Sequence, residues 1–352
     1  MAQARGARAP ARLVPRGLRG WAMTRVLTEF DTGHCGAIHD VQLDHYGECL
    51  ATASADGHIR LWDVQKPEEP SLVADLGGHA GPVYQVCWAW PSRGVLLASA
   101  GDDGRLLIWG RRKTPGQWHV VHSEDLHRHG SLRAVAWAPE DRGAVLACAS
   151  ADGTVTIISH IGAVETVDGT VEHRWMTHPF QAHSGQANAV SWASTRSEDP
   201  DKYVGLAGAR LATAGDDGVR VWSWDSANSR WEPETLETPD FPHAPARDVS
   251  WKPWGGICEV LASATAQTVV IWEQDAAEAG DRTWRSPGRA DLEEEVWKVS
   301  FTDLGGIVLA SIGEEEQRNV LLKRRLDGIW DIIPVEEEGE AMDEVEEEEE
   351  EE

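Results

Sequence analysis

The sequence predicts an all-β protein in which one four-stranded unit is repeated six times, and three observations support this prediction. Tryptophan is unusually abundant, with 18 residues against 4 Phe and 3 Tyr, and such enrichment usually has one recurring structural cause. A short strand of the form V-x-V-x-W recurs at intervals of 45–59 residues. Tight turns, often Asp-Gly, separate β-branched and aromatic runs, which is typical of hairpins. Four strands in a unit of this length indicate a propeller blade.

The first strand of each unit places a large apolar residue in one fixed slot. The six strands read IHDVQLD (38–44), VYQVCWA (83–89), LRAVAWA (132–138), ANAVSWA (187–193), ARDVSWK (246–252) and VWKVSF (296–301), and the slot holds Leu43, Trp88, Trp137, Trp192, Trp251 and Phe301. A second strand follows in each unit, reading LATAS, LASAG, LACAS, LATAG, LASAT and LASIG. The third β-rich run reads HIRLW, RLLIW, TVTII, VRVW, TVVIW and NVLLK.

A fourth strand completes each unit and carries its own tryptophan in five of them, at Trp118, Trp175, Trp231, Trp284 and Trp330. Unit six already has its last strand at Ile329–Ile333. One further strand precedes unit one and consists of Arg25, Val26, Leu27, Thr28, Glu29 and Phe30. The expected total of 25 strands falls three short of a closed seven-bladed ring. Two arrangements stay open: a closed six-bladed ring, or an open ring that receives three strands from another protein.

Five units open with a histidine in the loop before the first strand, at His34, His79, His129, His183 and His243. This arrangement resembles the WD-repeat family, in which the His, a second-strand Ser or Thr, the turn Asp and a third-strand Trp form a buried hydrogen-bonded tetrad. The resemblance implies tetrads at His34, Thr52, Asp56 and Trp62; at His79, Ser99, Asp103 and Trp109; at His183, Thr213, Asp217 and Trp222; and a partial one at His129 and Asp152. Cys148, Ile158 and Ala266 depart from the pattern, which weakens toward the C-terminus.

Composition excludes several classes of function. The formal net charge of −27 argues against nucleic acid as a direct partner. No apolar run reaches the roughly 18 residues of a membrane-spanning helix, so we expect a soluble chain. Five scattered cysteines, an odd number without a CxxC pair, indicate reduced thiols in the cytosol or nucleus. Because nucleotide, zinc-protease and hydrolase motifs are also missing from the sequence, we expect neither an enzyme nor a cofactor.

One histidine-rich stretch has enough ligands to suggest a metal, with His119, His122, His127 and His129 close to two acids. We interpret it as an outer strand followed by the loop histidine of unit three. Strand alternation separates such side chains onto different faces, so no metal site is expected.

The two ends differ in composition from the core. Residues 1–22 contain five arginines and no acid. They are either a disordered extension outside the native chain or, on the second interpretation, a targeting segment. Residues 336–352 contain 13 acids and no base, which predicts a disordered acidic tail. The propeller is expected to span residues 23–335.

From about Met23 to Trp330 the sequence resembles the Sec thirteen family of WD-repeat propellers. The stretches that carry the likeness include DTGHCGAIHDVQLDHYGECLATASADGHIRLWDV, ADLGGHAGPVYQVCWAWPSRGVLLASAGDDGRLLIW, VAWAPEDRGAVLACASADGTV, NAVSWA and VWKVSF. The resemblance implies an open six-bladed propeller to which a helical-solenoid partner donates a three-stranded blade. It implies a structural role in the COPII vesicle coat at the endoplasmic reticulum, with a Sec thirty-one type partner. It also implies a role in the nuclear pore, with a nucleoporin of the Nup ninety-six or one-forty-five C type.

In this interpretation Arg25–Phe30 is a clasp that completes the partner's blade, and membrane association comes only through the coat. Some family members also join a nutrient-signalling assembly. Two alternatives stay open: a Seh-type nuclear pore propeller, and a closed-ring WD-repeat adaptor that recognises substrates. The long acidic tail and the EEEQ insertion at residues 314–317 depart from the family pattern.

Overall fold

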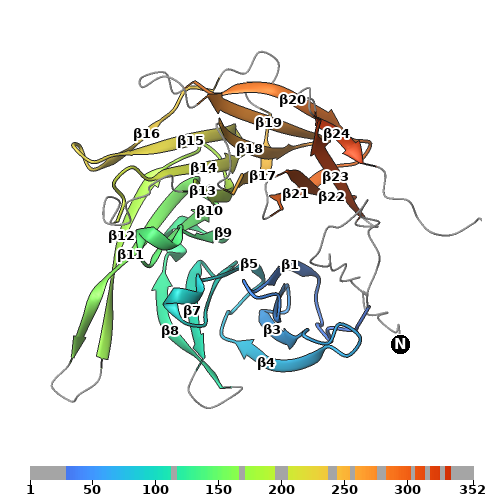
Figure 1. Cartoon of the computed structure of the whole chain (residues 1–352). Coiled ribbons are helices and arrows are strands. Elements are labelled where there is room, and N and C mark those ends of the chain that lie inside the picture. The colour runs from blue at the N-terminus through green and yellow to red at the C-terminus, as the bar shows by residue number, and fades with distance from the viewer. Residues whose placement is uncertain are drawn as a thin grey trace, which may run out of the picture.

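The computed structural model describes residues 29–111, 117–165, 171–194, 205–236, 244–253, 258–275, 283–302, 306–313, 318–325 and 330–333. In this part of the chain, 24 strands form six four-stranded antiparallel sheets that follow one another around an axis (Figure 1). The expected all-β, six-bladed propeller is therefore confirmed.

The blades follow the chain in order, and the innermost strand of each comes first. The strands are β1 Ile38–Leu43, β2 Cys49–Ser54, β3 His58–Asp63 and β4 Ser71–Gly77 in blade one; β5 Val83–Trp88, β6 Leu96–Gly101, β7 Arg105–Arg111 and β8 Trp118–Asp125 in blade two; β9 Leu132–Trp137, β10 Val145–Ser150, β11 Thr154–Glu165 and β12 Val171–Gln181 in blade three; β13 Ala187–Trp192, β14 Arg210–Gly215, β15 Gly218–Asp225 and β16 Arg230–Pro233 in blade four; β17 Ala246–Trp251, β18 Cys258–Thr265, β19 Thr268–Asp275 and β20 Arg285–Asp291 in blade five; and β21 Val296–Phe301, β22 Ile307–Ile312, β23 Arg318–Arg324 and β24 Trp330–Ile333 in blade six. Short 3₁₀ turns lie at Pro91–Arg93, His127–His129 and Glu140–Arg142.

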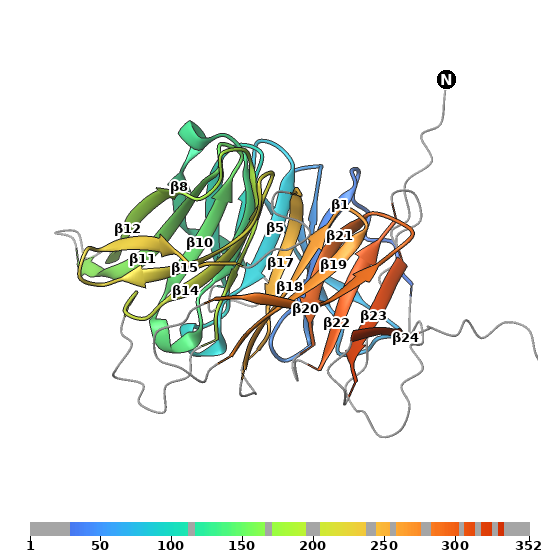
Figure 2. The same cartoon turned by 90° about the horizontal axis from the view of Figure 1, so that it is seen from above.

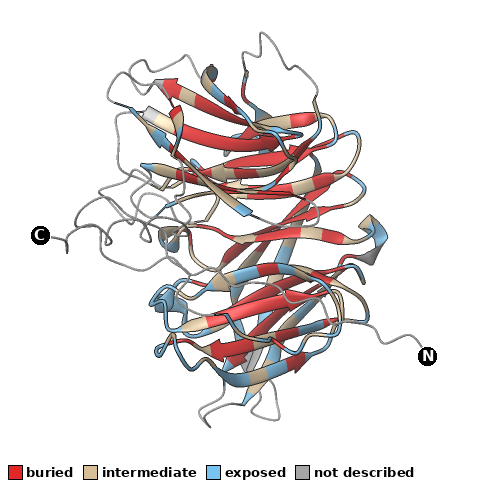
Figure 3. Ribbon diagram, turned by 90° about the vertical axis from the view of Figure 1, so that its right-hand side faces the viewer, coloured by how far each residue is buried: buried red, intermediate tan, exposed pale blue. Residues whose placement is uncertain are grey.

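Neighbouring blades pack through a large residue on one side and small residues on the other. Between blades one and two, Ala51 and Ala53 of β2 lie against Val86 and Trp88 of β5 in one buried cluster. The alanines leave room for the indole, so the two sheets approach without a void. The same pairing of small and large residues recurs around the ring, and Figure 3 shows buried residues along the strands of successive blades.

The order of packing stops at the two ends of the ring. Each inner strand packs on the next, from β1 through β5, β9, β13 and β17 to β21. Within the described residues, β21 makes no comparable packing with β1. Blades six and one therefore face each other across the open side of the ring (Figure 1), and Figure 2 shows the same six blades from above.

Two sequence expectations need comment. Arg25–Thr28 of the expected first strand lie outside the described residues, and Glu29 and Phe30 belong to no strand. Trp284 was expected within a fourth strand but lies just before β20, where it forms an isolated parallel bridge with Leu236 of blade four. Its indole is fully buried between the two blades, and its N–H donates to Glu234 (2.8 Å), which explains why it leaves the ladder of its own blade.

Residues 1–22, 314–317 and 336–352 lie outside the described residues. Within the described part, no helix is long and apolar enough to cross a membrane.

Candidate binding site at the open side of the ring

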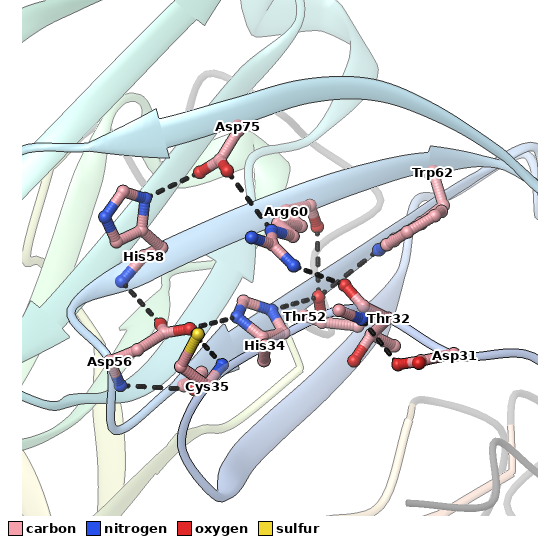
Figure 4. A network of polar contacts seen from close by, with 12 residues as sticks. Asp31, Thr32, His34, Cys35, Thr52, Asp56, His58, Arg60, Trp62 and Asp75 are labelled. Atoms are coloured by element: carbon pink, nitrogen blue, oxygen red, sulfur yellow. Dashed lines mark hydrogen bonds and ion pairs between the residues drawn. The ribbon is translucent and has the colours of Figure 1, made fainter. Parts of the chain in front are cut away.

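The tetrad of blade one joins the loop before β1 to the strands β2 and β3 and to the turn between them (Figure 4). Nδ1 of His34 lies 2.9 Å from Asp56 Oδ2, and Nε2 lies 2.9 Å from Thr52 Oγ1. The indole N–H of Trp62 donates to the same Thr52 oxygen over 3.4 Å. With a proton on Nδ1, His34 donates to the Asp56 carboxylate, and its Nε2 pairs with the Thr52 hydroxyl, so each group has a partner.

Blades two and four repeat this geometry. His79 lies 3.0 Å from Asp103 and 2.8 Å from Ser99, whose oxygen accepts from the Trp109 indole N–H (2.9 Å). In blade four, His183 contacts Asp217 and lies 2.8 Å from Thr213, which accepts from Trp222 (3.0 Å). The His, Asp and Ser or Thr side chains of these tetrads hydrogen-bond one another. We therefore interpret the repeated His–Asp pairs as structural rather than as acid–base pairs available to a substrate.

Blades three and five keep only parts of the network. His129 lies 2.8 Å from Asp152, while the apolar Cys148 and Ile158 are buried in the other two slots. In blade five the Trp272 indole N–H donates to Ser263 (3.0 Å), and Ala266 takes the turn position with a positive φ of 49°. His243 lies outside the described residues.

The tetrad aspartates are held ionised. Burial by itself would raise the pKa of Asp56, but hydrogen bonds from His34 and from the backbone N–H groups of His58 and Cys35 outweigh it and lower the pKa to about 2. The same balance lowers the pKa of Asp217. Burial lowers the pKa of His79 and of His183 despite their aspartate partners, so both rings are neutral near pH 7.

The inner rim carries a second, inter-blade network. We call the third residue of each inner strand the rim residue: Asp40, Gln85, Ala134, Ala189, Asp248 and Lys298. Wherever a rim residue can accept a hydrogen bond, it accepts one from the backbone of the next blade. The Val86 N–H donates to Asp40 (3.1 Å), the Val135 N–H to Gln85 (2.8 Å) and the Val299 N–H to Asp248 (2.8 Å).

Lys298 connects the last blade to the first. Its ammonium contacts Asp40, which is almost fully buried, while the Lys298 side chain stays 40% exposed. Desolvation of the ammonium at the rim would lower the pKa of Lys298, but the Asp40 and Asp248 carboxylates outweigh it and raise the pKa. The ring is thus joined across its open side at the rim, away from the outer strands.

Blade one presents a wall at this side whose inner strand is uncovered, while Leu50 and Trp62 farther out are buried. Val41 is 44% exposed and Leu43 is 39% exposed, whereas the equivalent Val86 and Trp88 of blade two are buried against blade one. The equivalent inner-strand valines are likewise buried in blades three to six. Phe30 covers only the outer part of this wall, where its ring meets the Trp62 indole edge-on at 5.0 Å.

Blade six presents the opposite wall. Leu309 and Leu321 are only half-buried there, although the matching Ala51 and Leu61 of blade one are fully buried by blade two. Ser311 and Asn319 lie on the same wall and hydrogen-bond each other over 2.9 Å. The two walls together form an apolar, strand-lined site with no covering blade among the described residues.

The described residues contain no group of three or more His, Cys, Asp or Glu that could hold a metal ion. The thiols of Cys35, Cys49, Cys87 and Cys148 are free. Sequence reasoning singled out the tetrads but missed the rim residues. The rim position can be found in the sequence, because it directly precedes the central valine of each inner strand. The hydrogen bond that it makes cannot be read there, because the donor belongs to the next blade.

Comparison with known proteins agrees with this architecture. The family model described as "WD domain, G-beta repeat" matches residues 24–63 and 70–110. The chain is 33% identical over 319 residues to "Protein SEC13 homolog" of Drosophila melanogaster, covering 88% of this chain and 83% of that protein. It is 36% identical over 313 residues to "Protein transport protein SEC13" of Yarrowia lipolytica, covering 87% and 98%. A chain of "Crystal Structure of Mitotic Checkpoint Complex" superposes with a TM-score of 0.57 at 16% identity over 83% of this chain and 76% of that chain, a likeness of fold alone.

Replacing Trp109 with Ala should lower the free energy of unfolding by roughly 3–5 kcal/mol, because it removes a buried indole and leaves Ser99 without a donor. Urea unfolding followed by circular dichroism measures this change. Trp297→Ala is the matched control, since Trp297 is 41% exposed and should alter stability by less than about 1 kcal/mol. Equal losses for both variants would contradict the assigned role of the tetrad.

Acid should destabilise the chain in two stages. The folded pKa values of His79 and His183 lie below the unfolded value, so their contribution is present above about pH 6.5 and falls as the pH drops below it. The depressed pKa values of Asp56 and Asp217 add a second loss from about pH 4 toward pH 2. Melting temperatures measured from pH 8 to pH 3 test this, and a flat profile between pH 7 and pH 5 would contradict the first stage.

Proposed function

This chain belongs to the SEC13 family of WD-repeat propellers, and on that premise we propose that it is a non-enzymatic protein-transport subunit whose open ring accepts a blade from a partner. The partner class is a helical-solenoid coat subunit of the Sec thirty-one type. In this role the protein is a structural scaffold of the COPII outer coat on the endoplasmic reticulum and its vesicles.

The observation that carries the proposal is the exposure of Leu43. This slot holds a buried aromatic residue in blades two to five, because the preceding blade covers it. Blade one has no preceding blade in the described chain, and an apolar wall with strand edges invites strand addition. A blade from another protein would bury both walls at once.

The same site serves the second expected setting, the nuclear pore scaffold, where a nucleoporin would supply the blade. A Seh-type propeller would use the same geometry, and the curated relatives named SEC13 favour the first assignment. A closed-ring adaptor is disfavoured, because a closed ring buries the inner strand of every blade, including Val41 and Leu43.

The Arg25–Phe30 segment fits the proposal as a clasp. Phe30, the last residue of this segment, already packs on Trp62 at the edge of the open side. In this proposal the segment would supply the fourth strand of a blade whose other three strands come from the partner.

Leu43→Asp should weaken binding of a three-stranded blade segment from a Sec thirty-one type subunit by at least about tenfold, because the complex would bury an unpaired carboxylate. Isothermal titration calorimetry measures the affinity. Binding of the segment to the unmodified chain should also raise its melting temperature through linkage.

Val120→Asp is the matched control, since Val120 is 41% exposed on β8 of blade two, away from the open side. Both variants should keep the stability of the free chain within about 1 kcal/mol. Equal affinity of the two variants for the segment would show that the partner binds elsewhere.

Three variants of the chain test the clasp. Deletion of residues 1–22 should leave partner affinity unchanged, whereas Leu27→Pro and deletion of residues 1–30 should weaken it, because proline removes a ladder donor. Because the proline variant retains the contact of Phe30 with Trp62, it tests the strand hydrogen bonds of the clasp separately from the packing of Phe30. Unchanged affinity for Leu27→Pro would remove the clasp from the proposal.

A further inference from the structure

The hydrogen bonds of the rim network all run from a backbone N–H of one blade to the rim residue of the blade before it, and the rim residue of the last blade cannot accept such a bond. The rim residues of blades one, two and five each accept a backbone N–H from the following blade. Blade six carries Lys298 at this position, and an ammonium has donors but no acceptor. Lys298 therefore cannot continue the network and instead reaches forward to the carboxylate of the following rim residue, Asp40.

The contacts of Asp40 indicate which kind of side chain Lys298 binds. One carboxylate oxygen contacts the Lys298 ammonium, and the other accepts the Val86 N–H from the next blade. A single aspartate thus binds both the ammonium of blade six and the backbone N–H of blade two. Asp248 lies near Lys298 as well, but its oxygens already accept the N–H groups of Val249 and Val299.

A seventh blade would change this arrangement. An inner strand placed between β21 and β1 would stand between Lys298 and Asp40, so the ammonium would lose its present partner. The Val41 N–H occupies the place in blade one that Val86, Val135 and Val299 occupy in theirs. Within the described part of the chain, no preceding blade supplies a side chain to accept it.

We propose that Lys298 recognises an aspartate on the inner strand of the inserted blade, and that this aspartate takes the place of Asp40 by accepting from Lys298 on one oxygen and from the Val41 N–H on the other. The inference rests on the proposed function and adds the chemistry of the partner. It makes Asp40 the intramolecular competitor, which holds Lys298 in the free chain and releases it when the blade enters. Recognition by charge at the rim adds selectivity to the apolar contacts of the walls.

The test measures affinities and association rates of the Sec thirty-one type blade segment for three variants of the full chain. Lys298→Met keeps the aliphatic stem and should weaken binding by about tenfold or more, and Lys298→Arg should restore most of it. Asp40→Asn keeps an oxygen acceptor for Val86 but removes the competing charge, so it should tighten binding by at least about threefold and speed association. Lys66→Met, an exposed lysine between β3 and β4, is the control and should change nothing.

The proposal predicts opposite changes in affinity for Lys298→Met and Asp40→Asn, and this distinguishes recognition of the partner from a purely structural role of the Lys298–Asp40 contact. If the Lys298–Asp40 contact only held the two walls at a fixed spacing, Lys298→Met and Asp40→Asn would change affinity in the same direction, and that result would overturn the proposal. Replacing the segment's inner-strand aspartate with Asn should weaken binding to the unmodified chain but not to Lys298→Met, as a double-mutant cycle requires. Equal losses in both backgrounds would also overturn it. Failure of the unmodified chain to bind the segment would instead remove the proposed function.

Discussion

The structure depends on one constraint: each blade has two apolar faces, and each face must be covered by a neighbour. The alanine-rich second strands and the large inner-strand residues are the two halves of that contact, as Ala51 and Trp88 illustrate. A linear series of such blades always leaves one face of each kind at its ends. A ring can bury them by closing, and this ring instead leaves them facing each other with Lys298 and Asp40 in contact at the rim. An open ring of this kind is suited to binding another blade.

The tetrads answer a different need. Each blade is a small sheet whose turns would otherwise be held only by the strands that they join. A chain of bonds from Trp109 through Ser99 and His79 to Asp103 fixes the loop before one blade to the turn within it. Because the indole also packs in the inter-blade core, the network couples the conformation of the turns to the packing between blades.

Much of the fold was predictable because it is local and repeated. The strands and their order follow from patterns within a single unit, and the partners of His34, His79 and His183 are those that the resemblance to WD repeats implies. The contact of Lys298 with Asp40 could not be predicted in this way, since the two residues are brought together by ring curvature across four intervening units. Trp284 was misplaced for a related reason: its burial against blade four determines its position more than the ladder of its own blade does. The expected strand at Arg25–Phe30 stays a prediction for its first four residues.

The sequence of blade six has a physical explanation in the wall it forms. Its departures from the repeat, Leu309 for Ala and Ser311 for Ala, look like decay when only the tetrad is considered. On the structure they lie on the face that meets solvent in the free chain and would meet a partner's blade in the complex. A fully apolar wall would favour edge-to-edge aggregation, while a fully polar one could not bind a blade. The Ser311–Asn319 hydrogen bond beside the half-buried Leu309 and Leu321 satisfies both conditions, since the Ser311 hydroxyl already donates to Asn319 before any partner arrives.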